Sequence, residues 1–117
     1  MEKKPGERYQ RMPLDAEVIL LKRGRSWDTQ GIDISATGLL VVRPENWEDP
    51  EDDHEFNIEL IQADGDTIAL AGRVVRVDDM GVALIFTRIP PESEAPLWRM
   101  LGAFADATEL LRGGAPA

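Results

Sequence analysis

The sequence predicts an all-β domain that ends in one helix, namely a six-stranded antiparallel β-barrel capped by a C-terminal α-helix. Between residues 16 and 87, short apolar segments alternate with turns that contain Gly or Asp. After Pro90 and Pro91, the spacing of apolar residues changes from two to about 3.6. Several short strands followed by a single helix are typical of a closed barrel with a helical cap.

The predicted strands follow one another closely along the chain. They cover residues 16–22, 27–34, 38–42, 54–61, 67–77 and 82–87. The clearest is the fourth, in which Phe56, Ile58 and Leu60 share one face. An Asp-Gly pair at residues 64–65 predicts a hairpin turn before the fifth strand.

The helix is predicted to begin near Ser93, which is expected to cap its N-terminus. Pro96 is tolerated within the first turn, and Gly113 with Gly114 ends the helix. One stripe follows the helical spacing and consists of Leu97, Leu101, Phe104, Thr108 and Leu111. This stripe is expected to face the barrel.

The chain of 117 residues is long enough for one domain. We divide it into a flexible arm over residues 1–13, a barrel plus helix over residues 14–112, and a tail over residues 113–117. Cysteine is absent, which excludes disulfides and thiolate metal sites. The charged N-terminus is not a signal peptide, and no apolar run reaches the roughly 18 residues of a membrane span. We therefore expect a soluble cytoplasmic protein without membrane insertion.

Charge is distributed unevenly along the chain. The formal net charge of −9 argues against binding to DNA or RNA, whose phosphate backbones attract clustered Lys and Arg. Ten acidic residues and no Lys or Arg lie between Glu45 and Asp66, whereas seven Lys and Arg lie in the first 25 positions. The basic N-terminal region could still receive a small anion.

The segment from Asp33 to Gly38 is predicted to form the corner between the second and third strands. As turn chemistry, Asp and Ser side chains bond nearby backbone N–H groups, and Gly adopts a positive φ. As a binding site, the Asp33 carboxylate accepts two hydrogen bonds from a guanine edge, whose N1–H and N2–H₂ donors are parallel. In that interpretation the Ser35 hydroxyl meets polar atoms of the ligand. Both interpretations fit the sequence.

The chain resembles the PilZ domain, a bacterial receptor module for the second messenger cyclic di-GMP. The resemblance covers roughly residues 7–110 and rests on four places. They are residues 11–15, the Asp-x-Ser-x-x-Gly corner at 33–38, the closing strands at 72–77 and 81–86, and Pro90-Pro91-Glu92 before the helix. No single place is specific, but their order and spacing are.

The resemblance implies that a cyclic dinucleotide binds between the arm and the corner. Asp33 and Ser35 would hold a guanine edge, and Gly38 would allow close backbone approach. Arg8 and Arg11 would contact phosphates and guanine faces.

The first motif of the family, Arg-x-x-x-Arg, is incomplete in this chain. Its second Arg corresponds to Arg11, but Glu7 stands at the first position and Arg8 follows one place late. In an extended arm, residues four apart point the same way and residues three apart point to opposite faces. Arg8 and Arg11 therefore need a local turn to clamp one ligand.

Two functions from different classes follow. In the first, the protein is a stand-alone cyclic di-GMP receptor, in which the ligand orders residues 1–13 onto the barrel and a protein partner reads the new surface. In the second, it is an adaptor that keeps the barrel without binding cyclic di-GMP and works through protein contacts, for instance in pilus or motility machinery.

No pattern in the sequence indicates an enzyme. Ser35 has no histidine nearby, and the single histidine, His54, makes neither a catalytic pair nor a zinc site. The acidic run at residues 48–53 lacks the ligand spacing of a calcium loop. We therefore expect no catalytic residues, no metal and no cofactor.

The three tryptophans have different surroundings in the sequence. Trp47 lies in the acidic loop, where an exposed ring could anchor a partner protein. The alternative, which we favour, is that Trp47 folds back on the barrel. Trp27 opens a strand near the basic turn, and Trp98 is expected in the core or at its edge.

Overall fold

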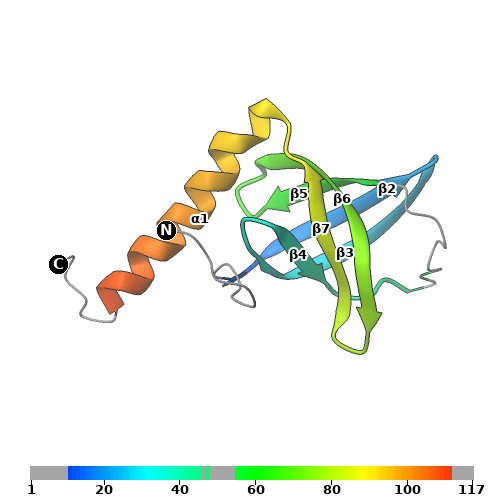
Figure 1. The fold of residues 1–117 in the computed structure, drawn as a ribbon, viewed down its shortest axis with the longest axis horizontal. Helices are drawn as coiled ribbons and strands as arrows, with labels where there is room; N and C mark the ends of the chain where they lie inside the picture. Colours follow the sequence, from blue (N-terminus) through cyan, green and yellow to red (C-terminus); the bar gives the residue numbers. More distant parts are fainter. Residues whose placement is uncertain (1–10, 46, 48–54, 112–117) are drawn as a thin grey trace.

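The computed structural model in Figure 1 describes residues 11–45, 47 and 55–111, and for residues 103–111 it describes the helix backbone alone. Its elements are β1 (Met12–Pro13), β2 (Ala16–Lys22), β3 (Arg25–Ile34), β4 (Gly38–Val41), β5 (Phe56–Gln62), β6 (Thr67–Asp78), β7 (Gly81–Arg88) and α1 (Pro91–Leu111). The six predicted strands and the helix are confirmed, with ends that differ by up to two residues.

The strands form one antiparallel sheet in the order β1-β3-β2-β5-β6-β7-β4. An additional pairing between β3 and β4 closes strands β2 to β7 into a six-stranded barrel. Closure leaves no free edge among these strands, so every strand has a partner on both sides. The predicted barrel with one C-terminal helix is confirmed, and Figure 1 shows the helix leaving the barrel from the end of β7.

The two-residue strand β1 was not predicted. Met12 pairs with Ile34 and Pro13 pairs with Asp33, so the last residues assigned to a flexible arm are part of the sheet. A proline fits here because β1 lies at an edge, where its missing N–H leaves no ladder bond unmade. The remaining arm residues, 1–10, lie outside the described part of the chain.

Alternation along the strands places apolar side chains inside the barrel. The largest fully buried ones are Phe56, Leu20, Ile34, Leu39, Ile58, Leu60, Ile68, Leu84, Leu97, Val18, Val41 and Val82. Burying each Leu, Ile or Phe side chain stabilises the fold by about 1.5–3 kcal/mol. Leu97 comes from α1, so the helix fills one end of the same core.

Ser93 does not cap the helix as predicted. The helix begins at Pro91, which places Ser93 inside the first turn. Its hydroxyl donates a hydrogen bond of 2.5 Å to the backbone oxygen of Ala69 in β6, and its side chain is buried. Ser93 therefore fastens the first turn of α1 to the barrel. The predicted end at Gly113 lies outside the described residues, and no helix among those residues is both long and apolar enough to cross a membrane.

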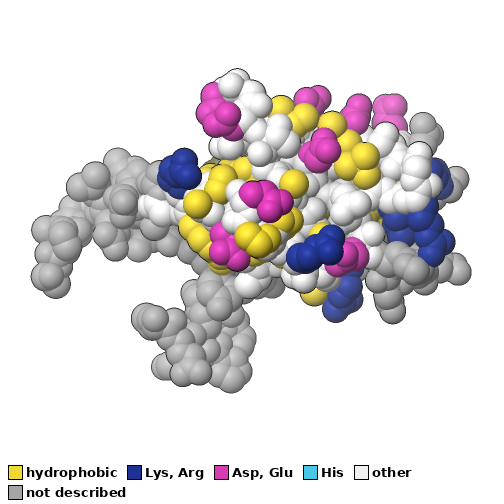
Figure 2. Space-filling view, turned by 90° about the horizontal axis from the view of Figure 1, so that it is seen from above, with side chains coloured by type: hydrophobic (Ala, Val, Ile, Leu, Met, Phe, Trp, Pro, Cys, Tyr) yellow, Lys and Arg dark blue, Asp and Glu magenta, His cyan; other side chains and the backbone are white. Residues whose placement is uncertain are grey.

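Trp47 packs inside an aromatic cluster, which confirms the favoured alternative that it folds back on the barrel and corrects its interpretation as an exposed partner surface. Its ring centroid lies 5.3 Å from that of Trp27 and 5.7 Å from that of Phe56, and the residue is only 8% exposed. The large apolar area of an indole ring favours this burial. Lys22 and Arg25 lie over rings of the cluster, and Figure 2 shows basic side chains gathered at the end of the molecule away from the helix.

Trp98 also differs from its prediction. It was expected in the core or at its edge, but it is 45% exposed on α1. Its neighbour Leu97 takes the inward position, and successive helix residues point about 100° apart.

Candidate functional site

A β-bulge in β3 turns Asp33 toward the outside of the barrel. Gly31 pairs with Val41 and Asp33 pairs with Leu40, so Ile32 is an extra residue without a partner in β4. In a regular strand Asp33, two residues after Gly31, would point to the same inner face, and the bulge at Ile32 breaks this alternation. Bulges of this kind often re-aim a side chain beside a functional site.

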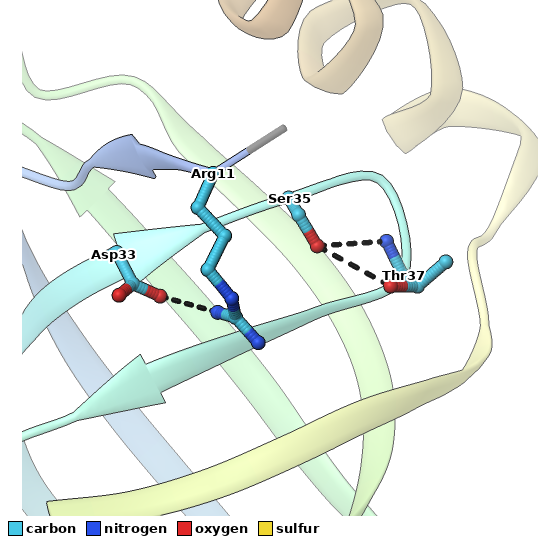
Figure 3. Close-up of polar contacts among 4 residues, drawn as sticks. All are labelled: Arg11, Asp33, Ser35 and Thr37. Atoms are coloured by element: carbon cyan, nitrogen blue, oxygen red, sulfur yellow. Dashed lines mark hydrogen bonds and ion pairs between the residues drawn. The ribbon is translucent and has the colours of Figure 1, made fainter. Parts of the chain in front are cut away.

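The pairing of β1 with β3 brings Arg11 to Asp33. Because Pro13 lies opposite Asp33, Arg11 emerges from the sheet beside the corner. Its Nη1 donates a hydrogen bond to Oδ1 of Asp33, as Figure 3 shows. The Arg11 side chain is 40% exposed and that of Asp33 is 26% exposed. One cation and one carboxylate thus meet on the accessible outer face of the barrel.

Ser35 is turned into the corner rather than toward solvent. It is 2% exposed, and its Oγ accepts a hydrogen bond of 3.2 Å from the backbone N–H of Thr37. A second contact of 3.3 Å joins its Oγ to Oγ1 of Thr37, and its own N–H donates to the oxygen of Gly38 at 2.9 Å. In this structure the Ser35 side chain therefore sets the shape of the corner (Figure 3).

Gly38 is required by the barrel itself. The positive φ expected there is not observed; the described residues with positive φ are Arg23, Gly24, Gly65 and Gly81. A Cβ atom at Gly38 would instead lie 2.2 Å from the backbone oxygen of Leu84 in β7. No carbon atom can approach an oxygen so closely, so a side chain at this position would push β4 away from β7.

A pocket of about 300 Å³ lies beside the corner. Its lining consists of Ala36, Thr37, Phe86, Thr87, Arg88 and Ile89. The backbone oxygen of Thr37 accepts a hydrogen bond of 2.8 Å from the N–H of Phe86, which holds the two walls of the pocket together. Thr37 was not among the predicted site residues, although its exposed position between Ser35 and Gly38 follows from the same corner.

A larger cavity of about 500 Å³ lies between α1 and the β5–β6 turn. It contains none of the predicted site residues. Its acidic residues include Asp64, whose Oδ1 accepts the N–H of Asp66 and so shapes the turn. The corner therefore remains the better candidate, because it joins a cation, a carboxylate and an adjoining pocket.

The predicted site residues are partly brought together. Arg11 and Asp33 are in contact, while Ser35 and Gly38 lie behind them in the corner. Trp47 belongs to the aromatic cluster, and Arg8 lies outside the described residues. Within the described part of the chain, no group of His, Cys, Asp and Glu side chains has the arrangement of a metal site.

Comparisons with known proteins agree with this fold. The family model of the PilZ domain matches residues 7–103, and the chain therefore belongs to the PilZ domain family. The crystal structure of an uncharacterized Legionella protein is similar in fold, with a TM-score of 0.54 and 20% sequence identity. That similarity covers 86% of this chain and 99% of the Legionella chain. No curated protein matches the chain.

Membership defines the class of protein. PilZ domains are modules of the cyclic di-GMP-binding type, and they form a family of binding domains rather than of enzymes.

Proposed function

We propose that this protein is a cyclic di-GMP receptor whose ligand binds at the β3–β4 corner. The observation that supports the proposal most strongly is the contact between Arg11 and Asp33 on the outer face of the barrel. These two residues come from different motifs of the family, and together they offer a donor for phosphate and an acceptor for a guanine edge.

The chemistry of the two side chains matches the two parts of the ligand. The Asp33 carboxylate has two oxygens, which accept the parallel N1–H and N2–H₂ donors of guanine. The planar guanidinium of Arg11 bonds phosphate oxygens in a fork and stacks on a base. A ligand that enters between them replaces one ion pair by two charge-assisted interactions.

The free energies of the two kinds of interaction favour replacing the ion pair by bonds to the ligand. An ion pair between partly exposed side chains contributes about 0–1 kcal/mol. A hydrogen bond to a charged group contributes about 1.5–3 kcal/mol. Arg11 and Asp33 are each partly exposed, so their ion pair is weak. Breaking it and forming two hydrogen bonds to the ligand therefore lowers the free energy.

The signal in this proposal passes through the N-terminal arm. Met12 and Pro13 hold the end of the arm on β3, so a ligand bound by Arg11 lies where the arm joins the barrel. Binding would order the arm, and a protein partner would bind the new surface.

Glu7→Arg completes the family motif and is expected to tighten the binding of cyclic di-GMP. Unchanged affinity in both Glu7→Arg and Arg8→Ala would show that these arm residues do not touch the ligand.

Isothermal calorimetry with cyclic di-GMP tests the receptor proposal. We expect a dissociation constant in the micromolar range or tighter, and a loss of about 10- to 150-fold in Arg11→Ala and in Asp33→Ala. Asp28→Ala removes an exposed carboxylate from the same strand and is the control for Asp33; Arg99→Ala, on α1, is the control for Arg11. An absence of heat at high protein concentration would contradict the proposal.

The second candidate function is an adaptor that works through protein contacts without cyclic di-GMP. Two observations favour it: Arg11 and Asp33 already satisfy each other, and Trp98 presents an exposed indole ring on α1. Absence of ligand binding, together with association with another protein that Trp98→Ala abolishes, would support this function over the receptor.

A further inference from the structure

A second β-bulge turns Arg88 toward the outside of the barrel near the same corner. Gly72 pairs with Phe86 and Ala71 pairs with Arg88, so Thr87 is the extra residue. Phe86 packs against the core from the inner face. In a regular strand Arg88, two residues after Phe86, would point to the same inner face.

The bulge instead gives Arg88 the register of an outward position. Its partner Ala71 is also opposite Asn57 in β5, and Asn57 is exposed. The corner is thus flanked by two bulges, at Ile32 and Thr87. Each bulge moves one charged side chain, Asp33 or Arg88, from the inner to the outer face.

Arg88 lines the pocket that adjoins the corner, together with Thr37. Its Nη2 is 3.5 Å from Oε1 of Glu55, and the two side chains are 63% and 43% exposed. The other carboxylate oxygen of Glu55 accepts a hydrogen bond from the hydroxyl of Thr87. Glu55 is therefore held in place by the bulge residue, while its pairing with Arg88 is long, exposed and weak.

We propose that Arg88 is a second anion-binding arginine of the corner, which binds a phosphate group of the dinucleotide in the pocket between Thr37 and Thr87. Glu55 holds Arg88 in the free protein and releases it to the ligand. This inference rests on the proposed receptor function and adds a residue to it.

Topology places the two arginines on opposite sides of the corner. Arg11 precedes β1, which pairs with β3, whereas Arg88 ends β7, which pairs with β4. A cyclic dinucleotide has two phosphates on opposite sides of its ring, so two separated cations suit it. The arm carries Glu7 where the family motif has an arginine, and Arg88 supplies positive charge from the other side of the corner.

Local cations matter because the whole chain carries a formal net charge of −9. The general field of such a protein repels a phosphate, so binding depends on side chains within a few ångströms of it. Arg88 also lies next to Ile89, the linker to α1. A phosphate bound there contacts the segment that carries the helix.

Calorimetric titration of the full chain with cyclic di-GMP tests the inference through two variants with opposite expected effects. Arg88→Ala removes the cation and is expected to weaken binding about tenfold or more. Glu55→Gln keeps an acceptor for the Thr87 hydroxyl but removes the competing charge, and it is expected to tighten binding up to about fivefold. A purely structural role of the ion pair predicts the same sign for both variants, because each breaks the same pair.

Two controls remove the same charges elsewhere. Arg99→Ala removes an exposed cation from α1, and Glu59→Gln removes a carboxylate farther along β5. Both are expected to leave the affinity within about twofold, since Arg99 lines the other cavity and Glu59 lies four residues, about 13 Å, along the strand from Glu55, beyond the screening length of about 8 Å.

Opposite shifts in Arg88→Ala and Glu55→Gln, with unchanged controls, support the phosphate subsite. Unchanged affinity in Arg88→Ala, or weaker binding in Glu55→Gln, overturns the subsite and leaves the receptor proposal standing. If the unaltered protein takes up no cyclic di-GMP, the receptor proposal fails and the subsite fails with it.

Discussion

The guanidinium of Arg11 donates a hydrogen bond to the carboxylate of Asp33, a residue 22 positions later in the chain. This contact exists because the short strand β1 lies beside β3, and because a bulge at Ile32 turns Asp33 outward. Two ordinary features of a β-sheet thus bring a guanidinium and a carboxylate together on the outer face of the barrel. The ion pair also means that a ligand must compete with Arg11 for the carboxylate.

The close approach of β4 and β7 at Gly38 predicts a strong effect of a single methyl group. Gly38→Ala places a Cβ 2.2 Å from the oxygen of Leu84, and the resulting shift of the strands is expected to lower the free energy of unfolding by about 1–3 kcal/mol. Urea denaturation measures this difference. Gly102→Ala is the control: no atom lies within 4 Å of its added Cβ, so this helix position should gain about 0.5–1 kcal/mol. Equal stability of Gly38→Ala and the unaltered protein would contradict the packing argument.

The Ser35 hydroxyl is predicted to act on the shape of the corner. Ser35→Ala removes the acceptor of the Thr37 N–H, and we expect a loss of about 0.5–1.5 kcal/mol in the free energy of unfolding. Ser26→Ala changes an exposed serine of β3 and should stay within about 0.5 kcal/mol. Urea denaturation of both variants gives the comparison. A Ser35→Ala protein as stable as Ser26→Ala would mean that the hydroxyl does not hold the corner.

The aromatic cluster predicts that two tryptophans respond differently to truncation. Trp47→Ala removes a buried ring that packs on Trp27 and Phe56, and it should lower the free energy of unfolding by about 3–5 kcal/mol. Trp98→Ala removes a ring that is 45% exposed and should have a much smaller effect. Thermal unfolding of the two variants distinguishes them. The reverse order would return Trp47 to the surface and restore its interpretation as a partner anchor.

Short apolar segments bounded by turn residues were sufficient to predict the six barrel strands. Phe56, Ile58 and Leu60 show a period of two, and their inward position follows from it. The strand β1 could not be predicted, because two residues that include Pro13 carry no periodic signal. The helix was predicted from its period, but Ser93 was assigned to the wrong role because its partner, the oxygen of Ala69, is distant in sequence.

The candidate site was predicted in its composition but not in its geometry. The Asp-x-Ser-x-x-Gly pattern identified the corner, and Arg11 was expected to act with it. A β-bulge leaves one residue of a strand without a partner in the neighbouring strand, and the sequence does not show which residue this is. The bulges at Ile32 and Thr87 therefore could not be predicted. Arg88 was missed for that reason: a period of two places it on the inner face.

An NMR titration that follows each backbone amide tests most directly whether cyclic di-GMP binds at this corner. The amides of Asp33, Ser35 and Thr37 are predicted to shift on addition of cyclic di-GMP, whereas those of the β5–β6 turn at Asp64 and Gly65 stay unchanged. These shifts should disappear in Asp33→Ala and persist in Asp28→Ala. Shifts confined to another surface, or no shifts at saturating ligand, would contradict the account.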